Sequence, residues 1–289
     1  MSPSAVTQRG EPFSVLMPLW GKDDPVWVER AIRSATIDQQ LQPDHLILTV
    51  DGPLPPALEQ ITERVEAGEF GPARVLRHRA HRGIAAALQD GLLAAPTELI
   101  ARADADDLCR PERFARQIPV MASGDLDVLG SAMQEFSDRI NVGTGPWRLR
   151  PLTQERIEAY ATQHCPFHHP TVVLRRSAVL AAGGYRDLAL LEDYWLWERM
   201  LLAGARVANL PEALVDYRAD EQLFRRRGGV RLLLSDLWLQ RQMLLDRMIG
   251  PGRFAANVLQ RVVYRLAPSP LRRLVYRLGV ERWLRRRSG

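Results

Sequence analysis

Cysteine, lysine and long apolar runs are scarce or missing in this chain of 289 residues. Its two cysteines, Cys109 and Cys165, are too few for a disulfide framework, so we expect a protein of the reducing cytoplasm. No uncharged apolar run reaches the roughly 18 residues that a membrane-spanning helix needs, and residues 1–11 lack the apolar segment of a secretory signal. Lys22 is the only lysine, so arginine supplies nearly all of the positive charge.

Three common nucleotide and metal motifs are also missing. No G-x-G-x-x-G segment follows the first predicted strand, which disfavours a dinucleotide site, and no G-x-x-x-x-G-K-[ST] segment is present, which excludes a P-loop enzyme. Asp104 and Asp106 have the spacing that opens an EF-hand loop, but Leu108 stands at the next ligand position and the required glycine is absent. Any site must therefore be built from other residues.

The pattern of apolar residues predicts an α/β protein. Apolar residues make up 46% of the chain, enough for a sizeable core. Strands alternate with helices of about 10–15 residues, which is typical of βαβ units and a mostly parallel central sheet with helices on both faces. Ligands of such sheets bind beyond the carboxyl ends of the strands. The predicted strands cover 13–19, 45–50, 73–77, 99–102, 127–130, 171–174 and 206–214, with a turn at Pro211; the main predicted helices cover 25–38, 58–67, 84–95, 111–121 and 190–202; residues 141–160 are expected to be irregular.

Acidic residues follow two of the predicted strands. Asp104, Asp106 and Asp107 come directly after the apolar strand at 99–102, and each carboxylate raises the cost of ionising its neighbours. A divalent cation would offset this repulsion, and Mg²⁺ and Mn²⁺ prefer carboxylate oxygens, so we predict a metal–diphosphate site here. The alternative is a solvated acidic turn that caps the next helix. Asp51 ends the second strand, where it could bind a nucleotide base or simply cap a turn.

Three further segments carry candidate catalytic or binding groups. Glu192 and Asp193 open a predicted helix, where the helix dipole favours acids and where a general base could also lie. Arg82 precedes Gly83 at the start of another helix, a position suited to a phosphate or to a plain surface turn. The segment 164–169 contains three histidines and a cysteine, but its spacing matches no common zinc pattern.

Charge is distributed unevenly along the chain. Residues 225–289 contain 16 arginines and three acidic residues, a net charge of +13, while residues 1–224 carry a net charge of −8. Within 271–287, apolar residues share one face of a predicted helix and arginines occupy much of the rest, which suits an anionic membrane surface. A helix packed on the rest of the protein, with a solvated basic face, would have the same pattern.

Several short motifs follow one another in a specific order. They are Pro18, Val50-Asp51-Gly52, the run from Arg82 to Gly91, Asp104-Ala105-Asp106-Asp107, His169-Pro170-Thr171-Val172, Gly183-Gly184-Tyr185, the run from Glu192 to Trp197, and Arg226-Arg227-Gly228-Gly229. This series resembles the family 2 glycosyltransferases of the GT-A fold (the nucleotide-diphospho-sugar transferase fold), and in particular the bacterial exopolysaccharide enzymes of the amylovoran-biosynthesis type. The resemblance covers about residues 13–230.

The resemblance implies a division of the chain. A catalytic domain would span residues 1–224, with a nucleotide-binding half at about 13–130 and an acceptor half at about 131–224. A basic helical extension would occupy residues 225–289.

The resemblance also implies roles on the donor side. Asp51 would bind the nucleotide base in a pocket lined by Pro18 and Leu19, and Arg82 would lie near the base or the phosphates. Asp104 would contact the ribose or the metal.

On the metal and acceptor side, the resemblance implies that Asp106 ligates Mg²⁺ or Mn²⁺. Asp193 would be the catalytic base, with Glu192 beside it shaping the acceptor site. We also expect His169 and Trp195 near the acceptor or the diphosphate.

Two departures from the family pattern affect this assignment. The familiar Asn-x-Gly is His81-Arg82-Gly83 here, and the late histidine that many relatives carry after Tyr-Arg is missing after Tyr217-Arg218. The third protein contact to the metal is therefore open, and Arg226 and Arg227 are candidates to hold the diphosphate instead.

The sequence thus predicts an inverting, metal-assisted glycosyltransferase. The donor would be a nucleotide-diphosphate sugar, UDP-linked, and the acceptor a glycan or a polyprenyl-linked sugar on the cytoplasmic face of the membrane. The alternatives are a sugar nucleotidyltransferase, which would want a glycine-rich basic loop after the first strand, and a nucleic-acid-binding protein acting through its arginines. The second leaves the acidic groups unexplained, so we expect no nucleic-acid partner.

Overall fold

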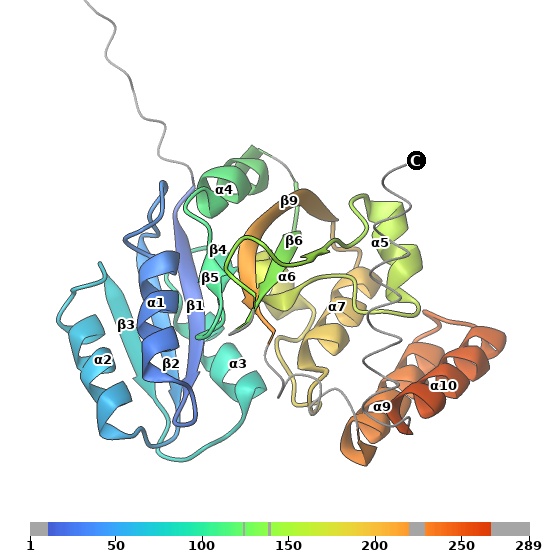
Figure 1. The fold of residues 1–289 in the computed structure, drawn as a ribbon. Coiled ribbons are helices and arrows are strands. Elements are labelled where there is room, and N and C mark those ends of the chain that lie inside the picture. The colour runs from blue at the N-terminus through green and yellow to red at the C-terminus, as the bar shows by residue number, and fades with distance from the viewer. Residues whose placement is uncertain (1–10, 124, 138–139, 220–228, 267–289) are drawn as a thin grey trace, which may run out of the picture.

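The computed structural model describes residues 11–123, 125–137, 140–219 and 229–266. Within them nine strands form one sheet in the order β3-β2-β1-β4-β8-β6-β9-β5, with β7 paired to β6 (Figure 1). The strands are β1 (Phe13–Trp20), β2 (His45–Asp51), β3 (Ala73–Arg77), β4 (Leu99–Arg102), β5 (Leu108–Cys109), β6 (Val128–Phe136), β7 (Trp147–Arg148), β8 (Val173–Arg175) and β9 (Val207–Arg218). The helices are α1 (Pro25–Ala35), α2 (Pro56–Glu66), α3 (Ile84–Ala94), α4 (Arg113–Ser123), α5 (Gln154–Ala161), the 3₁₀ helix η1 (His169–Thr171), α6 (Arg176–Ala181), α7 (Glu192–Leu202), α9 (Val230–Leu245) and α10 (Pro251–Leu266).

The sheet is mixed, whereas the sequence pattern predicted a mostly parallel one. Strands β3, β2, β1 and β4 are parallel, as are β6 and β9. Strand β8 runs antiparallel to both β4 and β6, and β5 and β7 are antiparallel to their partners. Strands alternate with single helices only from β1 to β4. The connection from β6 to β8 carries β7 and α5 instead of a single crossover helix, and antiparallel pairing does not require such a crossover.

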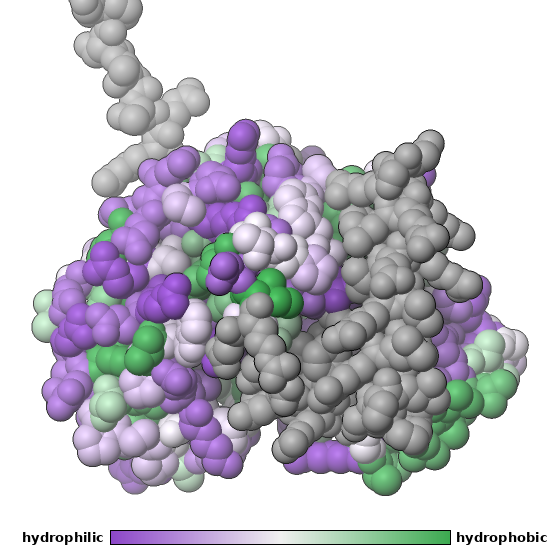
Figure 2. All heavy atoms as spheres, viewed as in Figure 1, coloured by the Kyte–Doolittle hydropathy of each residue, from purple (hydrophilic) through white to green (hydrophobic). Residues whose placement is uncertain are grey.

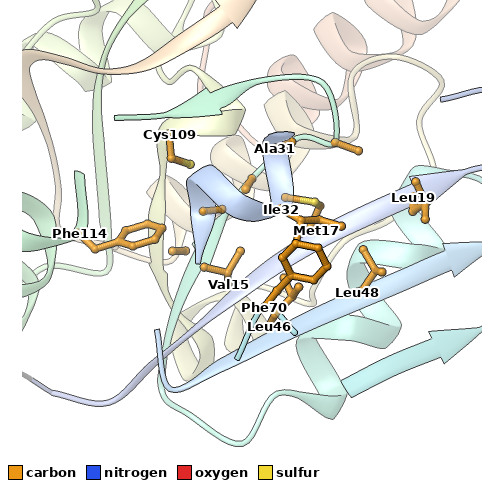
Figure 3. Close-up of a cluster of buried hydrophobic side chains, with 14 of the residues drawn as sticks. Val15, Met17, Leu19, Ala31, Ile32, Leu46, Leu48, Phe70, Cys109 and Phe114 are labelled. Carbon is orange, nitrogen blue, oxygen red and sulfur yellow. The ribbon is translucent and has the colours of Figure 1, made fainter. Parts of the chain in front are cut away.

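Side chains of β1 alternate between two hydrophobic clusters, one on each face of the sheet. Val15 and Met17 face the cluster formed with α1, α2 and α4, and Leu16 faces the cluster formed with α3 and α7. Figure 3 shows the first cluster, in which Ile32 of α1 and Phe114 contribute to the same core as the β1 side chains. Burial on both faces explains why the strand is apolar apart from Ser14.

Local signals explain two helix starts. Asp24 accepts a hydrogen bond from the Val26 N–H at 2.9 Å and caps α1, which begins at Pro25. Gly83, with φ of 92°, immediately precedes α3.

Two segments differ from their prediction. Helix α5 and strand β7 lie in the region expected to be irregular. Strand β9 continues through Pro211 to Arg218 instead of turning there. Its pairing with β6 shifts register between Ser131 and Met133, and proline is tolerated at such an irregularity because it has no N–H to donate.

The first part of the basic extension forms a helical hairpin packed on α7. Tyr194 of α7 shares a buried cluster with Leu239, Met243 and Ile249 of the hairpin. Asn257 of α10 donates hydrogen bonds to the Thr162 carbonyl at 2.8 Å and to the Gln240 side chain at 2.7 Å. Residues 229–266 are therefore joined to the rest of the protein by both apolar and polar contacts (Figure 1).

The predicted membrane helix at 271–287 lies outside the described residues. In the part of the chain that the structure describes, no helix combines the length and the apolar character needed to cross a membrane.

Burial of Glu198 on α7 predicts a pH-dependent cost to stability. Burial and the nearby charge of Asp246 raise the pKa of Glu198 from 4.5 to about 8. The folded state then holds a proton that the unfolded chain releases, so stability falls as the pH rises from about 4.5 to 8. We expect Glu198→Gln to raise the melting temperature by about 2–4 °C at pH 8.5, and by less at pH 5.

The matched control is Glu212→Gln, because Glu212 is exposed on β9. Calorimetry of both variants at the two pH values tests the assignment. A gain for Glu198→Gln that is equal at pH 5 and pH 8.5 would contradict it.

Candidate active site

Three of the carboxylates predicted to act on the donor or the acceptor, Asp104, Glu192 and Asp193, line one cavity, whereas Asp51 and Asp106 are not among its lining residues. The cavity has a volume of about 360 Å³. Asp104 reaches it from the loop after β4, His169 from η1, and Glu192 and Asp193 from the start of α7. These residues are separated by up to 89 positions in the sequence, and the insertion of β8 beside β4 brings their elements together.

A buried arginine faces the first of these carboxylates. Arg102, at the end of β4, is 2% exposed and forms an ion pair with Asp104. Arg102 was not among the predicted site residues, although a charged residue that ends an otherwise apolar strand was a signal for it. Because a buried charge is costly without a partner, Arg102 fixes the position of Asp104.

The other two aspartates of the cluster have different surroundings. Burial, followed by the charges of Asp104 and Asp23, raises the pKa of Asp106 to about 7. Burial and the same cluster raise the pKa of Asp107, whose Oδ1 accepts a hydrogen bond from the Arg218 N–H at 2.8 Å. Asp107 thus joins the loop to the end of β9. The interpretation of this residue as a helix cap is wrong, because β5 separates it from α4.

The chemistry of Asp104 and Asp106 fits a divalent cation. Both side chains are half-buried, and the pKa of Asp106 is raised first by burial and then by the charges of Asp104 and Asp23, a repulsion that a cation would relieve. Mg²⁺ is commonly held by one or two carboxylates together with substrate phosphates. Among the described residues there is no group of three or more His, Cys, Asp or Glu side chains suited to a metal. The three histidines of 164–169 are accordingly not part of such a group.

Asp51 holds the turn between β3 and α3. Its Oδ1 accepts from the Arg82 N–H at 2.7 Å and its Oδ2 from the Gly83 N–H at 2.8 Å. His78 and His81 lie within 3.3 and 2.8 Å of the same carboxylate. All of these interactions stabilise the charged form, and the pKa of Asp51 lies below its usual value although burial opposes this. Contact between Asp51 and a nucleotide base stays a prediction.

The residues predicted to line the donor pocket, in β1 and just before α3, differ in their burial and contacts. Leu19 is fully buried in the core, so its side chain does not line a ligand pocket as predicted, whereas Pro18 is half-buried. The Arg82 side chain binds Asp90 at 2.6 Å. An aromatic pair that the sequence analysis missed lies beside this turn: Trp20, which is 38% exposed, stacks on His81 with ring centroids 4.8 Å apart.

Two acidic side chains meet at the start of α7. Burial, followed by the charge of Asp193, raises the pKa of Glu192 to about 8. Burial also raises the pKa of Asp193, while hydrogen bonds favour its charged form. Asp193 accepts from the Tyr194 N–H at 2.6 Å and from the Cys165 thiol at 3.6 Å. Two buried carboxyl groups with such shifts are suited to proton transfer near neutral pH.

Of the other acceptor-side candidates, one lines the cavity and one packs elsewhere. His169 is buried, its Nε2 lies 2.9 Å from the Tyr185 hydroxyl, and burial lowers its pKa well below the usual value, so the ring is neutral. Trp195 packs edge-to-face on Trp238 of α9, with centroids 4.6 Å apart, and is not among the residues that line the cavity. Arg226 and Arg227 lie outside the described residues, and their contact with a diphosphate stays a prediction.

Comparison with known proteins identifies a matching family and several related proteins. The family model described as glycosyl transferase family 2 matches residues 14–183. The chain is 34% identical over 259 residues to the amylovoran biosynthesis glycosyltransferase AmsE of Erwinia amylovora, covering 89% of this chain and 94% of that protein. It is 29% identical over 273 residues to the Escherichia coli UDP-Gal:alpha-D-GlcNAc-diphosphoundecaprenol beta-1,3-galactosyltransferase, covering 94% and 98%.

Solved structures agree on the fold. The mannosyltransferase PcManGT from Pyrobaculum calidifontis, in complex with GDP-Man and Mn²⁺, superposes with a TM-score of 0.63 at 14% identity and covers 91% of this chain and 72% of that one. Residues 1–349 of S. aureus TarS, in complex with UDP-GlcNAc, superpose with a TM-score of 0.62 at 14% identity and cover 87% and 72%. The GT-A fold predicted from the motifs is confirmed.

The hydrogen bonds around Asp51 predict a structural cost for its removal. Asp51→Ala leaves two backbone N–H groups without their acceptor, and we expect a loss of about 1–3 kcal/mol in the free energy of unfolding. Hydrogen exchange at Arg82 and Gly83 should accelerate. The control is Asp38→Ala, which removes an exposed ion pair with Arg33. Equal losses in urea unfolding of the two variants would show that Asp51 does not hold the turn.

Proposed function

This chain belongs to glycosyl transferase family 2 and is a glycosyltransferase, and from this premise we propose a specific reaction. The enzyme transfers a sugar, with inversion, from a nucleotide-diphosphate sugar to a hydroxyl group of a glycan or polyprenyl-linked acceptor in bacterial polysaccharide or glycoconjugate synthesis. The observation that carries the proposal is the single cavity lined by Asp104, Glu192 and Asp193.

The donor is UDP-linked in this proposal. The relatives support it, because the E. coli protein is named for UDP-Gal and the TarS structure holds UDP-GlcNAc. Asp104 and Asp106 would hold Mg²⁺ or Mn²⁺, which when bound supplies charge stabilisation for the departing nucleotide diphosphate. Pro18, Asp51 and the Arg82–Gly83 turn would form the wall of the base and ribose pocket.

Asp193 is the catalytic base in this proposal. Its two hydrogen bonds favour its ionised form, while Glu192 keeps a proton near neutral pH because its pKa is about 8. Asp193 takes the proton of the acceptor hydroxyl as that oxygen bonds to the anomeric carbon. The bond from the anomeric carbon to the diphosphate oxygen breaks on the opposite face, and the nucleotide diphosphate leaves with the electron pair. The protonated carboxyl group of Glu192 donates one hydrogen bond to the acceptor.

Separate variants of the two acid groups test this division of labour. We expect UDP with Mn²⁺ to raise the melting temperature of the wild type, because a ligand that binds only the folded state stabilises it. GDP, dTDP and CMP should have smaller effects. Asp106→Asn should lose the shift, whereas Asp193→Asn should keep it and lose at least about a thousandfold in transfer rate, since both the base and its charge are removed.

Asp125→Asn serves as the control, because Asp125 is 83% exposed on its side chain. The products distinguish the enzyme alternatives: a transferase releases UDP from the nucleotide sugar, whereas a sugar nucleotidyltransferase releases pyrophosphate from a nucleoside triphosphate. No shift with any nucleotide, together with salt-sensitive DNA binding, would favour the nucleic-acid-binding alternative.

The location proposed for the enzyme is the cytoplasmic face of the membrane, to which it binds peripherally. Figure 2 shows apolar side chains gathered over the end of the molecule that α10 occupies. Leu259, Val263 and Leu266 share one face of this helix and are 66%, 64% and 58% exposed. Together with the arginines of 271–287, this face supports binding to an anionic surface.

A pair of substitutions on α10 tests the membrane proposal. We expect Leu259→Asp with Val263→Asp to lower co-sedimentation with vesicles containing phosphatidylglycerol at least threefold, because apolar burial is replaced by charge repulsion. The control is Leu93→Asp, which alters a leucine that is 53% exposed on α3. Equal binding by the wild type and the double variant would contradict a role for α10.

A further inference from the structure

A second cavity lies between the helical hairpin and the acceptor half of the protein. It has a volume of about 330 Å³, at the lower end of the range of about 300–1,000 Å³ for small-ligand pockets. Arg150, His164 and Cys165 line it from the catalytic domain, and Arg261 and Arg265 line it from α10. The hairpin therefore closes a space that the catalytic domain alone would leave open.

The described lining of this cavity carries excess positive charge. It contains three arginines and one carboxylate, Asp236, for a net charge of +2. Asp236 is 2% exposed and binds Arg261 at 3.2 Å and Arg265 at 2.7 Å, so it orients both guanidinium groups. A preoriented pair of arginines is suited to phosphate oxygens because guanidinium groups bind them in a bidentate manner.

Two observations on the opposite wall point to an anionic ligand. Arg150 donates to the Tyr160 hydroxyl at 2.7 Å, while its buried Nε has no hydrogen-bond partner in the described part of the chain. Burial, followed by the charges of Arg150 and Arg261, lowers the pKa of His164 to about 4, so the histidine adds no charge of its own. This wall therefore carries the positive charge of Arg150, whose Nε–H has no hydrogen-bond partner among the described residues.

This cavity is adjacent to the catalytic one. Arg150 and Cys165 line both of them. The Cys165 thiol lies 3.6 Å from Asp193, the proposed base. A molecule with its anionic group in the second cavity could therefore extend a sugar hydroxyl past Cys165 toward Asp193.

We propose that this cavity binds the diphosphate of a lipid-linked sugar acceptor, through Arg150, Arg261 and Arg265. The inference rests on the proposed function and assigns its acceptor class. The lipid would leave the cavity on the side of the α9–α10 hairpin. The diphosphate group would anchor the acceptor while its sugar occupies the catalytic cavity.

Binding of farnesyl diphosphate tests the proposal without requiring catalysis or metal. Isothermal titration in EDTA should detect binding to the wild type that persists when UDP is present in excess. We expect Arg150→Gln and Arg265→Gln each to raise the dissociation constant at least tenfold. Arg253→Gln, an exposed arginine on the same helix α10, is the matched control and should bind as the wild type does. Thermal melting of each variant verifies that it is folded.

The outcomes separate this proposal from the proposed function. Binding that UDP displaces, or that survives both arginine substitutions, overturns the acceptor subsite and leaves the test with UDP and Mn²⁺ unaffected. Inorganic pyrophosphate that binds as tightly as farnesyl diphosphate also overturns it, because the site would then take free diphosphate. Failure of UDP with Mn²⁺ to stabilise the protein, with arginine-dependent farnesyl diphosphate binding intact, would instead count against the donor side of the proposed function.

Discussion

The buried charge of Arg102 is the constraint on which the site depends. Its guanidinium group pairs with Asp104, and its charge also favours the ionised forms of Asp106, Asp107, Glu192 and Asp193 against the effect of burial. Without it, the pKa values of these carboxyl groups would rise further, because each of them is also raised by burial. One arginine at a strand end therefore favours ionisation of both acid groups.

The mixed sheet makes this arrangement possible. A β8 strand parallel to β4 would have required a crossover connection. The antiparallel β8 instead places η1, which directly precedes it, beside the end of β4. His169 of η1 and the start of α7 can then face Asp104 across the cavity. Strand β9 completes the other side, because Asp107 binds the backbone of Arg218 and β5 pairs with the same strand.

The helical hairpin has a comparable role on the acceptor side. Tyr194 immediately follows the proposed base and packs on Leu239 and Met243 of α9. The base is thus held at a junction between the α/β domain and the hairpin, and the second cavity opens at the same junction. Removal of the hairpin would expose Tyr194 and would take Arg261 and Arg265 away from the second cavity.

The sequence by itself determined the family, the first four strands with their helices, and the acidic groups at the strand and helix ends. These features depend on local signals: the apolar run of β4 followed by aspartates, the capping of α1 by Asp24, and the acids that open α7. The antiparallel strands, helix α5 and the role of Trp195 could not be predicted locally, because each depends on the element that packs against it.

Only the tertiary structure decided which charges lie together. Leu19 lies in the core, and Asp51 accepts hydrogen bonds from the backbone of Arg82 and Gly83. Arg102 forms an ion pair with Asp104. The tertiary structure also brought Arg150 and α10, more than 100 residues apart in the sequence, to the two sides of one cavity. Charge interactions and burial depend on distance in space, and sequence spacing determines that distance only within a helix, a strand or a turn.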